Sequence, residues 1–554
     1  MNLNNTRLIN FLIVIAGALM FIPYLGITHL FDWDEVNFAE SAREMLMTGN
    51  YLKVQINYQT FWEKPPFFIW MEAISMSIFG VNEFAARLPN ALIGIITLVV
   101  LFNIGKKVFD PVFGIFWVMA YAGSFLPHFY FKSGIIDPYF NLFIFLGIYF
   151  VWKVSAFQKG GSVRKKFAML AGVFLGLAVL TKGPVALIIS GLTILIYIFV
   201  RRSIKIFSWK EVFIFSVSLF LIASSWFLVI FIIDGPFFMT EFIDYQIRLF
   251  KTKDAGHGGP FFYHFLVLLF GCFPASMYVV KAFGKKYSDT PQNKQLKSVM
   301  VICLLVVLIL FSVVETKIVH YSSFCYFPIT FLAAYTLHKI YRHKIFMASF
   351  FRVVVLSFGC FFAFILTALP LCMINLKAVL KWIASIAPIK DDFVLANLEA
   401  NVNWSGLESM IGVFYFIVLI IFFLIAKKDL VKASIALFFG TMVTLQCVLY
   451  FIVPKVEGYI QASVIDFYQS QKGKNVYVEV YGFKSYAHLF YFDKKPGNRP
   501  ESFNEEWLLR GKIDKPVYFV TKITNHDLDQ IAGIKLINSK NGFSVYLRMP
   551  LSEP

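Results

Sequence analysis

Long apolar runs separated by short polar connections recur along most of the chain. The first run, Leu8 to Leu30, follows Arg7. At about 1.5 Å of rise per residue it is long enough to cross a hydrocarbon core of about 30 Å. The full pattern predicts about 13 membrane-spanning helices, an odd number that places the two termini on opposite sides. The later runs begin near Pro89, Val112, Tyr139, Ala168, Val185, Val212, Phe261, Val299, Tyr321, Phe346, Met410 and Val431.

Two kinds of connection alternate between these runs. Basic clusters mark every second connection, and the positive-inside rule predicts that these connections and the N-terminus are cytoplasmic. Carboxylates, histidines and lysines gather in the opposite connections, and charges of both signs at one face often mark a site. The basic connections are Lys106-Lys107, Lys153 to Lys166, Arg201 to Lys205, Lys281 to Lys286, Lys339 to Lys344 and Lys427-Lys428. The opposite connections are Asp32 to Glu63, Ile136 to Pro138, Thr181 to Pro184, Asp234 to Pro260 and Glu315 to His320.

The composition agrees with lipid as the solvent of most of this chain. Hydrophobic residues make up 58% of it, and 66 residues are Phe, whereas soluble domains are roughly 45–50% apolar. The net charge of +18 lies in short clusters between apolar runs, so we expect membrane lipids rather than a nucleic acid as partner. The six cysteines lack metal-ligand spacing and are expected to be small core residues.

Two long outer loops and a C-terminal segment stand apart from the spans. The loops 31–88 and 234–260 mix helical periodicity with amphipathic character, which predicts helices lying along the membrane surface. After Pro454 the hydropathy drops. We therefore expect an all-α membrane domain over 1–453 and a small α/β domain on the outer face over 454–554, with strands near Val476 to Tyr481, Val517 to Thr521 and Phe543 to Leu547.

The first outer loop resembles that of bacterial GT-C glycosyltransferases, in the group of protein mannosyltransferases and aminoarabinose transferases. The segments that carry this resemblance are Asp34 to Met45, Trp62 to Pro66 and Phe79 to Pro89. Later matches in order and spacing are Asp137-Pro138, Thr181 to Pro184, Arg248 with His257, Pro260 and Tyr263, and Thr316-Lys317 with His320-Tyr321 and Pro328. The resemblance covers roughly residues 1–450. It implies the GT-C fold, a bacterial inner-membrane location and transfer of a sugar from a polyprenyl-phosphate donor on the outer side.

That reaction places physical demands on the residues of the outer face. A sugar phosphodiester leaves with negative charge on phosphate, so cations must lie where that charge develops; the candidates are Lys64, Lys182, Arg248 and Lys317. Asp34 matches the catalytic aspartate of the family. With a hydroxyl acceptor it would accept the proton, whereas a phosphate acceptor is already ionised and leaves Asp34 to orient it or to stabilise the oxocarbenium-like centre.

Other outer residues are expected to support Asp34 or to contact the substrate. Asp137, the second acid of the family, is expected to orient the surroundings of Asp34 or a lysine, and it also suits the N-cap position before Pro138. Imidazole and carboxylate suit zinc or a similar divalent cation, which makes Glu63 and His257 candidate ligands, although His257 can equally bond the donor phosphate or a loop carbonyl. The residues expected to contact substrate are Glu35, Glu63, His257, Tyr263, His320 and Tyr321.

Lipid A or another envelope glycan is the leading acceptor, because the chain lacks the inserted central domain of the eukaryotic protein mannosyltransferases. Protein O-glycosylation is the second candidate. A lipid or sugar transporter is a third, from a different class, although transporters usually carry ionisable groups near the membrane midplane and repeated halves. A transferase requires Asp34, Lys64, Asp137, Lys182 and Lys317 to converge on one outward-facing cavity.

Overall fold

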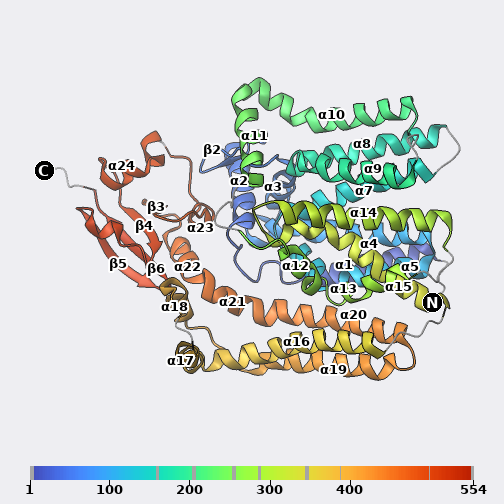
Figure 1. Ribbon diagram of the computed structural model, residues 1–554. Coiled ribbons are helices and arrows are strands. Elements are labelled where there is room, and N and C mark those ends of the chain that lie inside the picture. Colours follow the sequence, from blue (N-terminus) through green and yellow to red (C-terminus); the bar gives the residue numbers. More distant parts are fainter. Residues whose placement is uncertain are drawn as a thin grey trace.

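The computed structural model describes residues 5–156, 161–202, 207–251, 258–284, 289–343, 349–386, 389–497 and 499–550. Long, roughly parallel helices form a bundle, and a smaller region with a β-sheet lies beyond one end of it (Figure 1). We call this end of the bundle the sheet end and the opposite one the far end. The N-terminus lies at the far end and the C-terminus beyond the sheet (Figure 1).

Seven helical segments in the described residues are long and apolar enough to cross a membrane. They are α4 (Glu83–Val108), α7 (Asp137–Ala156), α10 (Trp209–Asp234), α14 (Pro291–Val313), α16 (Ser349–Ile374), Leu407–Ala426 with α19 (Met410–Ala426), and Leu430–Ile460 with α20 (Leu430–Cys447) and α21 (Val453–Ile460). Two sharply bent pairs raise the number to nine. These pairs are α5 (Pro111–Ala122) with α6 (Phe125–Phe129) and η1 (Tyr130–Lys132), bent by 83°, and α12 (Tyr263–Gly271) with α13 (Ala275–Val279) and η3 (Val280–Phe283), bent by 103°.

The remaining expected spans coincide with helices that are shorter or more polar. They are α1 (Thr6–Phe21), α8 (Ser162–Lys182), α9 (Val185–Arg201) and α15 (Tyr326–His343), which follows the 3₁₀ helix η4 (Val319–Cys325). The expectation of an all-α polytopic membrane protein is therefore confirmed. The number 13 stays a prediction, since nine of the described segments meet the length and hydropathy criteria.

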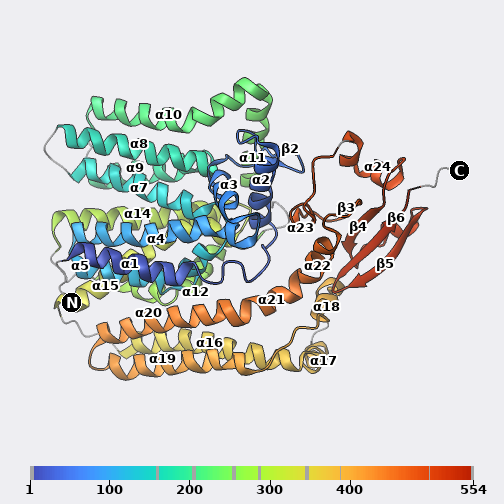
Figure 2. The same cartoon turned by 180° about the vertical axis from the view of Figure 1, so that it is seen from behind.

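Three helices of the two outer loops lie between the bundle and the sheet (Figure 2). They are α2 (Asp34–Thr48), α3 (Phe67–Phe79) and α11 (Pro236–Lys251). Every residue of α2 from Glu35 to Met45 is buried. The expectation that α2 lies along the membrane surface stays a prediction. Arg43 of this helix donates to Glu40 at 2.6 and 2.7 Å, which compensates the burial of both charges.

A four-stranded sheet forms the centre of the C-terminal region, with strand order β3-β4-β6-β5. Strands β3 (Tyr477–Val480), β4 (Val517–Lys522) and β6 (Phe543–Arg548) occupy the expected segments, and β5 (Ile534–Lys540) is an additional edge strand. β3 pairs parallel with β4, and the other two pairings are antiparallel. The short helices α22 (Ala462–Gln471), α23 (Ala487–Phe492) and α24 (Glu505–Arg510) accompany the sheet.

The last span does not end at Pro454, where the sequence predicts the start of a separate domain. A π-helical turn, Val448–Ile452, joins α20 to α21, and the helix continues to Ile460. Pro454 lies in the first turn of α21, where a missing N–H costs little, and the wider π turn before it accommodates the proline ring. The C-terminal region is thus joined to the bundle by a continuous helix.

The C-terminal region also contacts the loop that leads into α2. The amide of Leu30 donates to the Tyr491 hydroxyl at 2.6 Å, and the Gln461 side chain donates to the carbonyl of Leu30 at 2.8 Å. Arg43 of α2 donates to Asp493 at 3.0 Å and to the carbonyl of Lys494 at 2.9 Å. The start of α2 is therefore held from the C-terminal side of the chain.

A buried ion pair holds the start of α2 from the bundle side. Arg87 of α4 donates to both carboxylate oxygens of Glu35, at 3.0 and 2.7 Å, and to the carbonyls of Leu25, Thr28 and His29. Glu35 also accepts from the amides of Phe31 at 2.8 Å and Gly134 at 2.5 Å. Burial alone would raise the pKa of Glu35, but Arg87 and these amides outweigh it, so the pKa lies below its usual range.

Removing Arg87 should strongly destabilise the protein, because Glu35 would keep a buried charge without its partner. We expect Arg87→Met to lower the free energy of unfolding by about 3–5 kcal/mol. Thermal unfolding in detergent, followed by tryptophan fluorescence, measures this loss.

The control is Arg342→Met, which removes a half-exposed arginine from its ion pair with Asp110. An exposed pair contributes about 1 kcal/mol or less. In the double variant Glu35→Gln/Arg87→Met the loss should be smaller than in Arg87→Met alone. Equal losses in Arg87→Met and Arg342→Met would contradict this role of the buried pair.

Candidate active site

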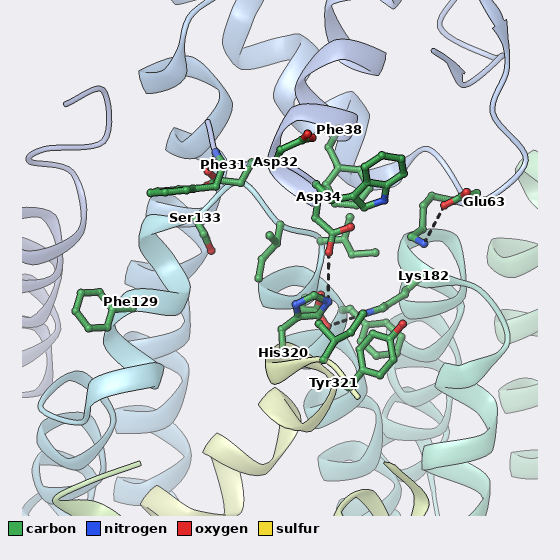
Figure 3. A pocket seen from close by; sticks show the side chains of 18 of the residues that line it. Phe31, Asp32, Asp34, Phe38, Glu63, Phe129, Ser133, Lys182, His320 and Tyr321 are labelled. Atoms are coloured by element: carbon green, nitrogen blue, oxygen red, sulfur yellow. Dashed lines mark hydrogen bonds and ion pairs between the residues drawn. The ribbon is translucent and has the colours of Figure 1, made fainter. Parts of the chain in front are cut away.

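A cavity of about 980 Å³ lies at the sheet end of the bundle. Its lining comes from the start of α2, the loop before α3, the ends of α7 and α8, α11 and η4 (Figure 3). Most residues expected to act in the outer loops line it: Asp34, Glu35, Glu63, Lys64, Asp137, Lys182, Arg248, His320 and Tyr321. Segments that are up to about 290 residues apart in the chain therefore meet around one space, as a transferase site requires.

His320 lies between the two aspartates. Its Nε2 is 3.3 Å from Asp34 Oδ2 and 3.9 Å from Asp137 Oδ2 (Figure 3). Burial lowers the pKa of His320 more than the charges of Asp137 and Asp34 raise it, so the pKa lies below the usual 6.5. The imidazole is therefore neutral at pH 7. It can donate a hydrogen bond to Asp34 without cancelling the negative charge of that carboxylate.

Asp137 is the first residue of α7, and Lys182 is the last residue of α8. The Lys182 ammonium donates to Asp137 Oδ1 at 2.6 Å, while Asp137 Oδ2 is buried and has no hydrogen-bond partner among the described residues. The same ammonium lies 5.2 Å from the ring centre of Tyr321. Asp137 thus holds a lysine at the cavity wall and keeps one oxygen directed toward His320.

A second basic group surrounds Tyr245 of α11. The Lys64 ammonium donates to the Tyr245 hydroxyl at 3.1 Å and lies 3.9 Å from Glu63. The Arg248 guanidinium stacks over the Tyr245 ring at 5.1 Å. Lys64, Arg248 and Lys182 thus present three cations to one part of the cavity, an arrangement suited to a phosphate group.

Two of the expected site residues lie outside this cavity. Lys317 does not line it: its ammonium donates to the carbonyls of Phe311, Ser312 and Val314, at 3.0 and 2.8 Å for the first two. These carbonyls end α14, and a cation there satisfies groups that the helix leaves unpaired. Lys317 therefore caps the end of α14, and its expected contact with the donor phosphate stays a prediction. Tyr263, at the start of α12, is also absent from the lining.

Glu35 lines the cavity but has little capacity left for substrate, because Arg87 and two amides occupy its oxygens. His257 lies outside the described residues. Among the described residues, no group of three His, Cys, Asp or Glu side chains has the arrangement of a metal site. Metal binding by Glu63 with His257 stays a prediction.

The sequence reasoning missed several residues of the cavity. Tyr245 carries no motif of its own, and its hydroxyl contact with Lys64 depends on how α11 packs. Lys132 and Arg87 had a usable signal, because each is a basic residue at the edge of an apolar run on the outer side. Lys484 had no such signal in the sequence, because it belongs to the C-terminal region. It lines the cavity, and its ammonium lies 4.5 Å from the ring centre of Trp33.

Comparison with known proteins shows what this chain is similar to. The family described as dolichyl-phosphate-mannose-protein mannosyltransferase matches residues 63–229. An uncharacterized protein of Aquifex aeolicus is 28% identical over 63% of this chain and 78% of that protein. The undecaprenyl phosphate-alpha-4-amino-4-deoxy-L-arabinose arabinosyl transferase of Wigglesworthia glossinidia brevipalpis is 25% identical over 61% of this chain. The match spans 60% of the length of that transferase.

The fold has a solved counterpart over nearly its whole length. The crystal structure of ArnT from Cupriavidus metallidurans bound to undecaprenyl phosphate superposes with a TM-score of 0.76 at 17% identity, covering 98% of each chain. This similarity includes the C-terminal region as well as the bundle. The chain therefore has the GT-C fold, and over residues 63–229 its sequence is similar to the dolichyl-phosphate-mannose-protein mannosyltransferase family.

Proposed function

We propose that this protein transfers a sugar from a polyprenyl-phosphate donor to lipid A or another envelope glycan at the periplasmic face of the bacterial inner membrane. The observation that carries the proposal is the convergence of Asp34, His320 and Asp137 with the cations Lys64, Lys182 and Arg248 on one cavity. The names of the arabinosyl transferase relatives support the donor class. The proposed orientation of the chain rests on its basic connections, which favour a cytoplasmic N-terminus and a periplasmic C-terminal region.

In this proposal the donor phosphate lies among Lys64, Lys182 and Arg248. The bond between the anomeric carbon and the phosphate oxygen breaks, and polyprenyl phosphate leaves with the electron pair. Arg248 can clamp a phosphate through two parallel hydrogen bonds, while the lysines act as compact charges. These cations stabilise the negative charge that grows on the leaving phosphate. Because the protein holds them in place before the reaction, little energy is spent on reorganising them during it.

Asp34 faces the other side of the reacting carbon. A hydroxyl acceptor would lose its proton to Asp34 as it attacks, whereas a phosphate acceptor attacks through an oxygen that is already ionised. In the second case Asp34 orients the acceptor or stabilises positive charge at the anomeric carbon. His320, 3.3 Å away, fixes the direction of the Asp34 carboxylate in both cases.

Protein O-glycosylation remains the second candidate function, because the family match carries the name of protein mannosyltransferases. A transporter is disfavoured, since Asp34, Asp137 and Lys182 of the cavity lie at the ends of α2, α7 and α8 and not along the middle of the spans.

Replacing Asp34 with Asn should abolish most of the transfer, because the amide removes the negative charge without changing the size of the side chain. We expect a loss of at least about 100-fold in rate. The measurement compares lipid A and glycoprotein mass spectra from a deletion strain complemented with either version, followed by the transfer rate of the purified proteins.

The matched control is Asp392→Asn, which alters an exposed aspartate that also opens a helix, α18 (Asp392–Leu398), outside the cavity. It should retain the wild-type rate. Envelope glycans that stay unchanged after deletion would overturn the proposed function, and a change confined to glycoproteins would favour the second candidate.

The transfer rate should fall in acid as His320 becomes protonated. The lowered pKa of His320 keeps it neutral at pH 7, and protonation below 6.5 would pair its charge with Asp34 and Asp137. We expect kcat/KM to be constant from about pH 7 upward and to decline as the pH falls below 6.5. In His320→Gln the decline should move to lower pH, and an unchanged acid limb would show that His320 does not control it.

A further inference from the structure

The helix α17 (Leu376–Ile386) is left uncovered by the rest of the protein. A single residue separates it from the end of α16, and none of its 11 residues is buried. Trp382 and Ile386 are 64% and 68% exposed. Among the described residues, only Leu376 of this helix packs against a cluster of buried apolar residues, the one that contains Trp404. The helix is thus held at its start, and the rest of its apolar surface lacks a protein neighbour in the described part of the chain.

The side chains of α17 divide into two faces. Apolar residues at steps of three and four share one face: Leu376, Val379, Leu380, Trp382, Ile383 and Ile386. Lys377, Lys381 and Ser385, at steps of four, share the other. Both lysines are exposed, and neither forms an ion pair with another residue of the described part of the chain. A basic amphipathic helix with a tryptophan is typical of helices that lie in a membrane interface.

The direction of α17 agrees with this pattern. Figure 1 shows α17 at the sheet end, viewed nearly along its axis, whereas α16 runs across the picture, and Figure 2 shows the same relation from behind. Since α16 is long and apolar enough to cross the membrane, a helix whose axis crosses the direction of α16 runs along the membrane plane. The axis of α17 therefore has the direction of a surface helix.

The end of α16 indicates what lies beside α17. Leu371 and Ile374, in the last turn of this span, are 50% and 46% exposed, so the apolar outer surface of the span continues into the apolar face of α17. Lipid surrounds such a surface on a membrane-spanning helix. A tryptophan is favoured where hydrocarbon meets the head groups, and lysines next to a span attract anionic lipids. These preferences favour a lipid surface over a protein partner.

We propose that α17 lies in the head-group layer of the membrane leaflet at the sheet end and binds anionic phospholipids there. Its apolar face rests on the acyl chains, Trp382 lies at their boundary, and Lys377 and Lys381 contact lipid phosphates. The next helix, α18, packs Phe393 against Phe543 of β6, with the ring centres 5.4 Å apart. α17 thus ties to the membrane surface the segment that braces the C-terminal sheet.

The first test measures the surroundings of each face of α17 in the full-length protein. Nitroxide labels are attached to Ile383→Cys and Ser385→Cys in nanodiscs of phosphatidylcholine and phosphatidylglycerol. The background is Cys372→Ser, because Cys372 is an exposed cysteine, and its own signal is subtracted. We expect the label at Ile383→Cys to be relaxed by oxygen, which concentrates in lipid, and the label at Ser385→Cys by a nickel chelate, which stays in water.

The second test measures the contribution of the two lysines. Short-chain phosphatidylglycerol is titrated into the detergent-solubilised protein, and binding is followed by the mobility of the label at Ile383→Cys. We expect the Kd to rise about fivefold for each lysine replaced in Lys377→Gln and Lys381→Gln. Replacing both lysines with Arg should leave the Kd near that of the unmodified lysines, because the charge is kept.

The matched control is Lys427→Gln/Lys428→Gln, which removes two exposed lysines directly after another span, α19, at the far end. It should leave the Kd unchanged, so that a general loss of positive charge is distinguished from a lost contact at α17. The thermal unfolding midpoint of all these variants should match that of the unsubstituted protein.

Several results would overturn the inference. One is equal access of the nickel chelate to both labels, which would place α17 in water. Another is protection of the label at Ile383→Cys from both reagents together with a dimer in light scattering, which would indicate a second copy of the chain. An unchanged Kd in Lys377→Gln/Lys381→Gln, or competition by glycerol phosphate as strong as that by the lipid, would also contradict binding of a lipid surface.

Discussion

The carboxylate of Glu35 connects the parts of this protein that have to meet. It pairs with Arg87 of α4, accepts from the amide of Phe31 just before α2, and accepts from the amide of Gly134 in the connection that leads to Asp137. Asp34 directly precedes Glu35 in the chain. One buried ion pair therefore sets the positions of Asp34 and Asp137 relative to the same helix, and breaking that pair costs about 3–5 kcal/mol.

The hydrocarbon solvent explains why so many polar groups collect at the sheet end. Charges are expensive within the apolar spans and cost less at their ends. Three charged residues of the cavity lie at helix ends. Asp34 begins α2, Asp137 begins α7, and Lys182 ends α8. The bundle thus acts as a frame that fixes the ends of several helices, and the chemistry lies where these ends converge.

The C-terminal region contributes to this frame although it carries no recognisable motif. Tyr491 and Gln461 hold Leu30, Asp493 pairs with Arg43, and Lys484 reaches the cavity beside Trp33. These contacts join the two ends of the chain around the entry to α2. The same arrangement keeps the polar face of α2 out of water and so accounts for the burial of Glu35 to Met45.

The sequence by itself determined the membrane character, the positions of the helical runs and most of the candidate site residues, nine of which line the cavity. Those conclusions follow from local properties: apolar length, the distribution of basic residues and short motifs in the outer connections. Only the tertiary structure decided which charges are free to act. Lys317 satisfies carbonyls at the end of α14, Glu35 is held by Arg87, and Lys132 and Lys484 face the cavity. Such roles depend on distances between segments far apart in the chain, and no local pattern of residues records them.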